Sequence, residues 1–237
     1  MTTDYRQLEQ QLTAHLGPAR RPIAVAFRPT APVGVQKFGG TEPSGCSFWR
    51  LAAAGRVFYT VPGDHANCAV GAYTHAIPLP AGRAGELEQT LGFMAGLGYV
   101  RMEEVPAIPR LPEAPGVVVY APLGETPLDP DVVLVAGRPG RLMLLQEAAL
   151  RAGVAAPAPL LARPTCMALP AALAQGVLAS TGCVGNRVYT DLGDDELYVA
   201  VPGRALAPLV AELGTIAAAN TTLREYHGQR RKDLATA

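Results

Sequence analysis

The sequence predicts an α+β fold in one compact domain, with a mixed sheet, covering helices and two similar halves. Strand patterns and helix patterns occur along the whole chain without the strict alternation of a doubly wound fold. A chain of 237 residues, of which 49% are hydrophobic, can bury a single core. Similar segments recur in the same order in the first and second parts of the chain, which predicts the two halves.

The first part of the chain opens with a helix pattern. Leu8, Leu12 and Leu16 are four residues apart and share one helix face, and Gly17 ends the pattern. The apolar run over residues 23–27 predicts a buried strand. The further expectations here are a loop over 30–45, a helix over 46–54, a strand over 56–61 and a helix over 86–97.

The second part contains the clearest strand patterns, over residues 117–120 and 132–136. A helix over 167–175 is expected, with Pro170 in its first turn, where proline is tolerated. Further expectations are a helix over 141–152, a strand over 197–201 and a helix over 205–226, with no regular element in the proline-rich stretches 105–115 and 155–164.

The two expected halves cover about residues 22–100 and 131–222. Four pairs of segments support them, in the same order: 25–29 with 135–139, 43–46 with 164–166, 68–74 with 183–190, and 77–80 with 199–202. The last pair predicts a strand at 77–80. If the halves share one ancestor, the segments that follow Cys46 and Cys166 must have the same secondary structure.

Charge and composition narrow the classes of partner. The formal net charge is zero, and the one dense basic run, residues 230–232, is interpreted as a solvated helix end, so no nucleic acid is expected. No apolar stretch suggests a membrane span or a signal peptide, which predicts a cytoplasmic protein with reduced cysteines. The oligomeric state is left open.

Four cysteines are the main candidate site. Cys46, Cys68, Cys166 and Cys183 occur as two corresponding pairs beside Gly, Pro or Asn, although none forms a Cys-x-x-Cys motif. Two halves related by a pseudo-twofold axis could bring four thiolates together, and soft thiolates select zinc, Cu(I) or an iron–sulfur cluster. The alternative is that each cysteine is a small buried hydrophobe.

The segment Gly182–Arg187 is the densest local signal. We interpret it as a glycine-rich turn in which Gly185, Asn186 and Arg187 bind an anionic ligand. The alternative is a tight turn with Arg187 in a salt bridge to the acidic run 191–196. His65, three residues before Cys68, is interpreted as a turn histidine on the surface; the alternative is a metal ligand or a base that generates a thiolate.

These segments resemble a known family. The strings 164–166, 180–189 and 198–203, together with 68–71, 121–123 and 130–133, are similar to the domain of unknown function 169 family of archaea and bacteria, over roughly residues 20–215. The family has no established activity, so the resemblance implies no reaction. It singles out Cys166, Cys183, Gly185, Asn186 and Arg187.

Three classes of function remain open from the residues. The leading one is a protein that binds zinc or an iron–sulfur cluster through the four cysteines. The second is a small-molecule binding protein with an anionic ligand at Arg187. The third is a thiol enzyme that uses Cys183 or Cys68 as a nucleophile.

Overall fold

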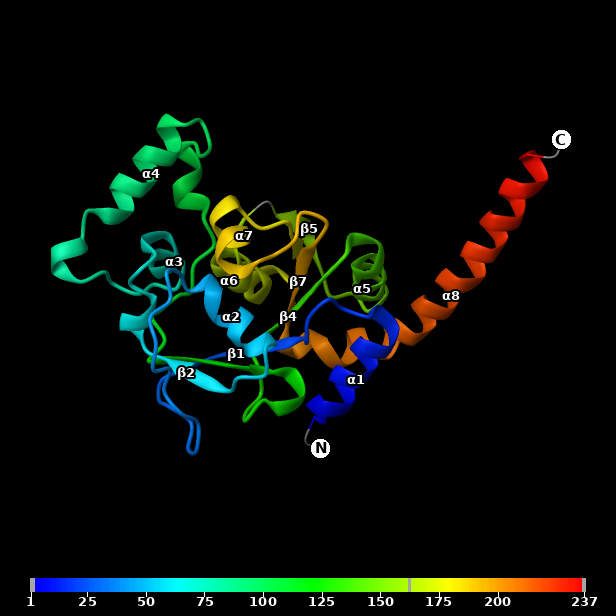
Figure 1. Cartoon of the computed structure of the whole chain (residues 1–237), viewed down its shortest axis with the longest axis horizontal. Coiled ribbons are helices and arrows are strands. Elements are labelled where there is room, and N and C mark those ends of the chain that lie inside the picture. Colours follow the sequence, from blue (N-terminus) through cyan, green and yellow to red (C-terminus); the bar gives the residue numbers. More distant parts are fainter. Residues whose placement is uncertain (1–2, 162, 236–237) are drawn as a thin grey trace.

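The centre of the computed structural model, which describes residues 3–161 and 163–235, is a mixed sheet of seven strands (Figure 1). Its strand order is β2-β3-β1-β4-β7-β6-β5, and every pairing between these strands is antiparallel except that of β5 with β6. The strands are β1 (Ile23–Arg28), β2 (Phe58–Thr60), β3 (Val117–Pro122), β4 (Val132–Gly137), β5 (Ala155–Leu161), β6 (Val177–Ser180) and β7 (Leu197–Pro202). The α+β prediction with a mixed sheet is confirmed.

Helices cover the two faces of this sheet. The α-helices are α1 (Tyr5–Leu16), α2 (Cys46–Ala53), α3 (Ala69–Thr74), α4 (Glu86–Gly96), α5 (Pro139–Arg151), α6 (Thr165–Gln175), α7 (Val184–Thr190) and α8 (Gly203–Ala235). One face packs against α2 and α6, and the other against α1, α5 and the first turns of α8. Helix α4 stands out from the body at the end that also carries α3 (Figure 1). Short 3₁₀ helices lie at Pro62–His65, Ala81–Arg83, Met102–Ala107 and Leu123–Glu125.

The adjacent strands β1 and β4 are buried on both faces. Ile23 and Val25 of β1, with Leu134 of β4, belong to the core beneath α2 and α6. Ala24 and Val133 belong to the core beneath α1, α5 and α8. Because side chains alternate along a strand, the continuous apolar runs of these two strands are explained by burial on both sides.

Several elements differ from the sequence prediction. β5 was not expected because of its prolines, but it is an edge strand of the sheet, where a missing N–H is tolerated. Pro170 lies in the second turn of α6 and not in the first. Residues 77–80 form no strand, since Pro78 and Pro80 remove ladder donors. The stretch 105–115 begins with the end of a 3₁₀ helix.

The pairing pattern is similar on the two sides of the β1–β4 pair. β1 pairs with β3 and β3 with β2, as β4 pairs with β7 and β7 with β6, all antiparallel. Lys37 forms an isolated parallel bridge with Tyr59 of β2. This bridge corresponds to the parallel pairing of β5 with β6 at the other edge of the sheet. The segments that follow Cys46 and Cys166 are both helices. These parallels do not show an internal duplication, which stays a prediction.

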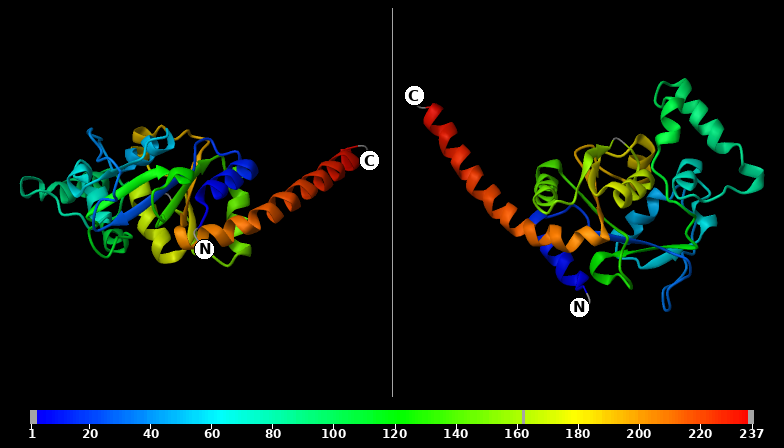
Figure 2. Two further views of the ribbon diagram at one scale, coloured as in Figure 1. Left: turned by 90° about the horizontal axis from the view of Figure 1, so that it is seen from below. Right: turned by 180° about the vertical axis from the view of Figure 1, so that it is seen from behind.

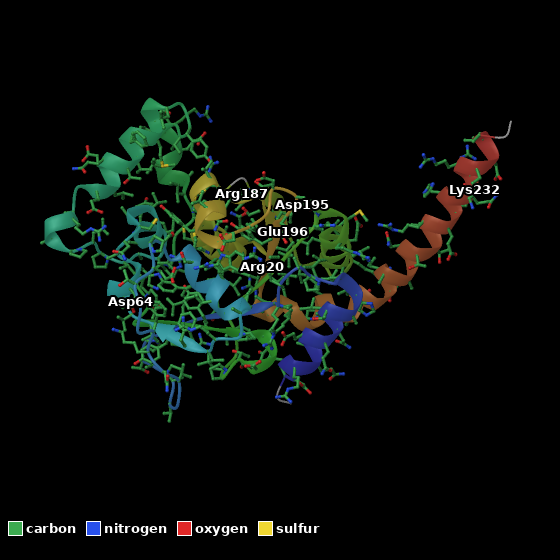
Figure 3. The ribbon with its side chains drawn as sticks, viewed as in Figure 1. Arg20, Asp64, Arg187, Asp195, Glu196 and Lys232 are labelled. Atoms are coloured by element: carbon green, nitrogen blue, oxygen red, sulfur yellow. The ribbon has the colours of Figure 1, made fainter. Side chains whose placement is uncertain are left out.

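Helix α8 leaves the body and projects away from it, as two further views show (Figure 2). Leu206, Leu209 and Leu213 are buried, whereas residues 221–235 are exposed. The basic run ending at Lys232 lies on this projecting part (Figure 3), consistent with a solvated helix end. By length and composition α8 is the one described helix that could cross a membrane; a single such helix is weak evidence for a span.

Two histidines are buried beside β2, so the surface position interpreted for His65 is wrong. His65 is 1% exposed, and its Nε2 lies 2.8 Å from Thr60 Oγ1. His75 is 2% exposed and its Nδ1 lies 2.9 Å from the Gly71 carbonyl oxygen. The two rings are stacked, with their centroids 5.6 Å apart. Burial lowers the pKa of His65 to about 3 and that of His75 to about 4, so both are neutral near pH 7.

These buried histidines predict a loss of stability in mild acid. Below pH 6.5 the unfolded chain takes up protons at both positions while the folded chain does not, until the pH falls to the folded pKa values. Each histidine then lowers the free energy of unfolding by about 1.4 kcal/mol per pH unit. Urea denaturation between pH 6.5 and pH 4 measures this slope.

A matched pair of variants assigns the slope. His65→Gln is expected to reduce the slope, whereas Leu223→Ala, at an exposed residue of α8 without a titratable group, leaves it unchanged. An identical slope in the parent protein and in His65→Gln would contradict a neutral buried His65.

Candidate functional site

All four cysteines line one cavity of about 770 Å³. It lies between the helices that carry them and the segment formed by α4 and the following 3₁₀ helix. Gly185 and Asn186 also line this cavity, so the fold brings together six of the seven residues singled out from the sequence. The seventh, Arg187, is not among the lining residues.

Cys46 and Cys166 form the inner pair. Each is 3% exposed, and each lies in the first turn of a helix, α2 and α6, which pack on the same face of the sheet. Their thiols are within hydrogen-bonding reach of each other. Met167 and Ile108 pack against the pair. The inner end of the cavity is therefore a thiol pair surrounded by apolar side chains.

Cys68 and Cys183 are the N-caps of two short helices. Cys68 Sγ accepts a hydrogen bond from the Gly71 amide at 3.4 Å, and Cys183 Sγ accepts one from the Asn186 amide at 3.4 Å. The sequence analysis interpreted the segment 182–187 as a glycine-rich turn. In the structure the residues after each cysteine form a helix, α3 or α7, whose first free N–H groups point at the sulfur.

The outer cysteines lie close to the inner pair. Gly71 of α3 shows the approach: a Cβ atom added there would lie 3.5 Å from Cys68 Sγ and 3.9 Å from Cys166 Cβ. Negative charge on Cys46 is felt at both Cys68 and Cys183, where it raises the pKa. The structure thus shows a close approach of Cys68 to Cys166, while Cys183 lines the same cavity.

Hydrogen bonding separates Cys46 from the other thiols. Four donors lower the pKa of Cys46 to about 6 although the residue is buried. They are the Cys166 thiol, the Cys166 backbone N–H, the Asn186 side-chain amide and the Ser44 hydroxyl. The hydrogen bond given to Cys46, together with burial, raises the pKa of Cys166. Burial raises the pKa of Cys68 and Cys183. A thiolate in this group is therefore most stable at Cys46.

The thiols do not form a closed set of ligands. Over residues 3–161 and 163–235, no group of three or more His, Cys, Asp or Glu side chains is arranged to hold a metal ion. His65 does not line the cavity, and its ring instead packs beside Gly45, where an added Cβ would lie 2.9 Å from Nδ1.

Asn186 connects the cavity to the core. Its Nδ2 donates to Thr165 Oγ1 at 2.8 Å, and the same oxygen accepts a hydrogen bond from Trp49 Nε1 at 3.1 Å. Asn186 is 2% exposed, and its Oδ1 has no hydrogen-bond partner among the described residues. This buried amide therefore keeps one free acceptor.

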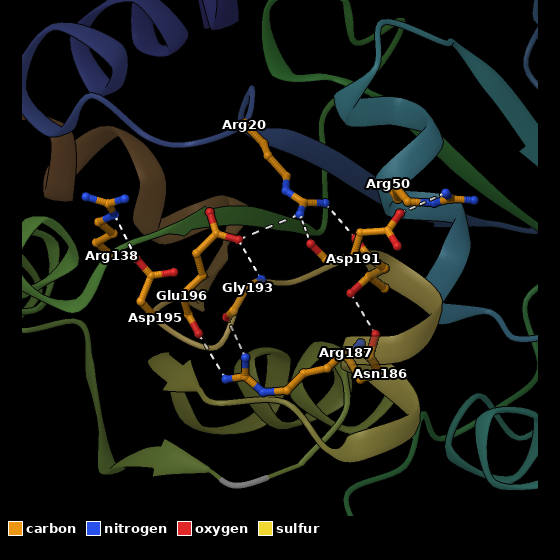
Figure 4. Close-up of polar contacts among 10 residues, drawn as sticks. Arg20, Arg50, Arg138, Asn186, Arg187, Asp191, Gly193, Asp195 and Glu196 are labelled. Carbon is orange, nitrogen blue, oxygen red and sulfur yellow. Dashed lines mark hydrogen bonds and ion pairs between the residues drawn. The ribbon is translucent and has the colours of Figure 1, made fainter.

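Arg187 holds the loop between α7 and β7 (Figure 4). Its guanidinium donates to the carbonyl oxygens of Gly193 at 2.6 Å and Glu196 at 3.0 Å. The partners are therefore backbone carbonyls of the acidic run, and Asp195 is paired with Arg138 at 3.0 Å. The anion-binding role of Arg187 stays a prediction, and its present contacts are those of a structural residue.

Arg20 fastens the same loop from the other side (Figures 3 and 4). It donates to the Thr190 carbonyl oxygen at 2.6 Å and to that of Asp191, and it lies 3.7 Å from the Glu196 carboxylate. Asp191 has a left-handed backbone with φ 53°, which is uncommon outside glycine. The two arginines therefore fix a strained turn directly after α7.

The sequence analysis missed the apolar wall of the cavity. Phe93 of α4 and Leu97, the residue that ends it, are 69% and 68% exposed, and Val184 of α7 is 65% exposed, yet all three line the cavity. Large apolar side chains at helical spacing usually indicate core, so the sequence carried no signal that these residues face a cavity.

Comparison with known families gives one match. The model of DUF169, described as "Uncharacterised ArCR, COG2043", matches residues 11–212. The chain belongs to the DUF169 family. The matched range contains all four cysteines and Gly185 to Arg187, while the projecting end of α8 in this DUF169 protein lies beyond it. No curated protein and no solved structure matches this chain.

The contacts of Arg187 predict its effect on stability. Arg187→Ala leaves two loop carbonyls without their charged donor, so the free energy of unfolding is expected to fall by about 1–3 kcal/mol. Urea denaturation measures the change, with Arg141→Ala, an exposed arginine of α5, as the control. A fully stable Arg187→Ala protein would argue against the structural role and favour the anion site.

Proposed function

We propose that this DUF169 protein binds an iron–sulfur cluster through Cys46, Cys68, Cys166 and Cys183. The observation that carries the proposal is that the four thiols line one cavity, and that each lies in the first turn or at the N-cap of a different helix.

The donor chemistry fits such a group. Thiolates are soft ligands that select zinc, Cu(I) or iron–sulfur clusters. Hydrogen bonds from backbone amides to the sulfurs, such as those from Gly71 and Asn186, are among the factors that set the reduction potential of a cluster. The N-terminal ends of helices favour negative charge, and a cluster ligated by four thiolates is anionic.

The size of the cavity favours a cluster over a single zinc ion. In a tetrahedral zinc site the metal–sulfur bonds are about 2.3 Å, so the sulfurs must close around one ion. The described thiols are not arranged that way. A cluster spreads its ligands around a larger centre than a single zinc ion does. Binding a cluster therefore requires a smaller movement of the thiols than binding zinc. Cys68 and Cys183, at the junctions of loops with short helices, are placed to make that movement.

Metal analysis of protein purified without oxygen tests the proposal. We expect stoichiometric iron and acid-labile sulfide with visible absorption, and a loss of both when any one of the four cysteines is changed to Ser. Met167→Leu, a cavity-lining change that keeps the thiols, is the matched control and is expected to retain the cluster.

Two results would separate the alternatives. Stoichiometric zinc in place of iron would support the thiol site and contradict the cluster. Metal-free protein that also fails to take up iron and sulfide in an anaerobic reconstitution would contradict metal binding by these cysteines.

A thiol enzyme is the second candidate, favoured by the donors around Cys46. A thiolate there is stabilised by the Cys166 thiol and backbone N–H, the Asn186 side-chain amide and the Ser44 hydroxyl. This differs from the sequence analysis, which placed the nucleophile at Cys183 or Cys68. Those two thiols lack this set of donors, and burial raises their pKa.

Alkylation of the metal-free, reduced protein tests this candidate. With iodoacetamide at neutral pH, the Cys46 sulfur displaces iodide, and mass spectrometry is expected to show Cys46 modified before Cys68 and Cys183. Asn186→Ala removes one donor and is expected to slow the reaction severalfold, whereas Met167→Leu leaves it unchanged. Faster modification of Cys68 or Cys183 would contradict the assignment.

We also infer that the two halves arose by duplication. The similar pairing order on the two sides of β1 and β4 supports this, as do the two cysteine N-caps. In this arrangement β3 corresponds to β7, which replaces the segment 77–80 as the partner of 199–202.

A further inference from the structure

We propose that the outer wall of the cysteine cavity binds a small apolar organic molecule, at a place distinct from the four thiols. This site goes beyond the proposed cluster and does not depend on it, because the two use different side chains of the same cavity.

The wall is made of exposed apolar side chains from two separate segments. Phe93, Leu97 and Tyr99 come from α4 and the residues after it, and they are 69%, 68% and 47% exposed. Val184 and Tyr189 come from α7 and are 65% and 40% exposed. Apolar side chains gathered around one concave surface mark a binding site more often than apolar side chains scattered singly.

The volume fits a small organic molecule. Ligand sites in proteins commonly enclose about 300–1,000 Å³ and are lined mostly by apolar groups with a few polar ones. At about 770 Å³, this cavity is much larger than a metal centre requires. The buried thiols of Cys46 and Cys166 occupy its inner end, which leaves the exposed apolar wall for another occupant.

Asn186 lies where the inner end of the cavity meets the wall. It lines the cavity and is 2% exposed. Its Nδ2 donates to Thr165 Oγ1, and its Oδ1 is turned toward Gly182, where an added Cβ would lie 2.7 Å away. Gly182 does not line the cavity, so the wall offers a ligand apolar contacts and not this acceptor.

The ion pair of Glu104 with Arg163 lies on the lining and joins the two sides. Glu104 belongs to the 3₁₀ helix after α4, Arg163 precedes α6, and their side chains are 3.2 Å apart. This contact joins the segment that follows Phe93 and Leu97 to the body that carries the thiols.

The single tryptophan provides the readout. Trp49 is two hydrogen bonds from Asn186, through Thr165, and the chain has no other tryptophan. We use the fluorescent probe anilinonaphthalene sulfonate, which has two aromatic ring systems. A probe bound in the cavity accepts energy from Trp49, whereas a probe bound on the projecting part of α8 does so far less.

The test is a titration of the full-length protein with this probe, following energy transfer from Trp49. We expect saturation at one equivalent. Leu97→Asp and Val184→Asp are each expected to weaken binding at least tenfold, because a carboxylate disrupts the apolar wall. Leu150→Asp, at a 61% exposed leucine of α5 that does not line the cavity, is the matched control and is expected to bind normally.

The outcomes separate this site from the proposed cluster. Wall variants are expected to keep the iron and sulfide content of the parent protein, and Cys→Ser variants are expected to keep probe binding. No saturable energy transfer in the parent protein, or equal affinity in Leu97→Asp, Val184→Asp and the parent, would overturn the apolar site whatever the metal analysis gives.

Discussion

Burial of β1 and β4 on both faces is the constraint on which the rest of the structure depends. A strand pair without a polar face must be covered on each side, and the chain does this with α2 and α6 on one face and α1, α5 and α8 on the other. Packing of α2 and α6 against one face brings their N-terminal turns together. Cys46 and Cys166 meet because each lies in one of those turns.

The position of each cysteine in its helix matters as much as its position in the fold. A thiol at a helix start faces N–H groups that no carbonyl of the helix can satisfy, and it also faces the positive end of the helix dipole. Gly71 and Asn186 show this directly, since their amides donate to Cys68 and Cys183. Four such starts around one cavity favour negative charge there, whether on a single thiolate or on a bound centre.

The sequence predicted the elements with a strong local pattern, such as α1 with its three leucines. The cysteines that it matched between the halves lie in like positions, Cys46 and Cys166 in first turns and Cys68 and Cys183 at N-caps. It failed where tertiary position overrides local preference. β5 was missed because prolines argue against a strand unless it is known to lie at an edge. The string Gly182–Arg187 was taken as a turn, in which all its side chains would share one site. In the structure the residues from Val184 onward form α7. This helix places Asn186 at the cavity and directs Arg187 toward the loop at Gly193.

The apolar wall and the thiols are best understood together. A cavity that served only to hold thiols in the core would gain stability by closing, because exposed side chains such as Phe93 and Leu97 would then leave water. These side chains instead stay exposed around the concave surface between α4 and α7. Their exposure costs stability in the isolated chain, and an apolar molecule bound on the wall would remove that cost. The physical argument for an organic ligand beside the thiols is therefore that it covers apolar surface that the fold itself leaves in water.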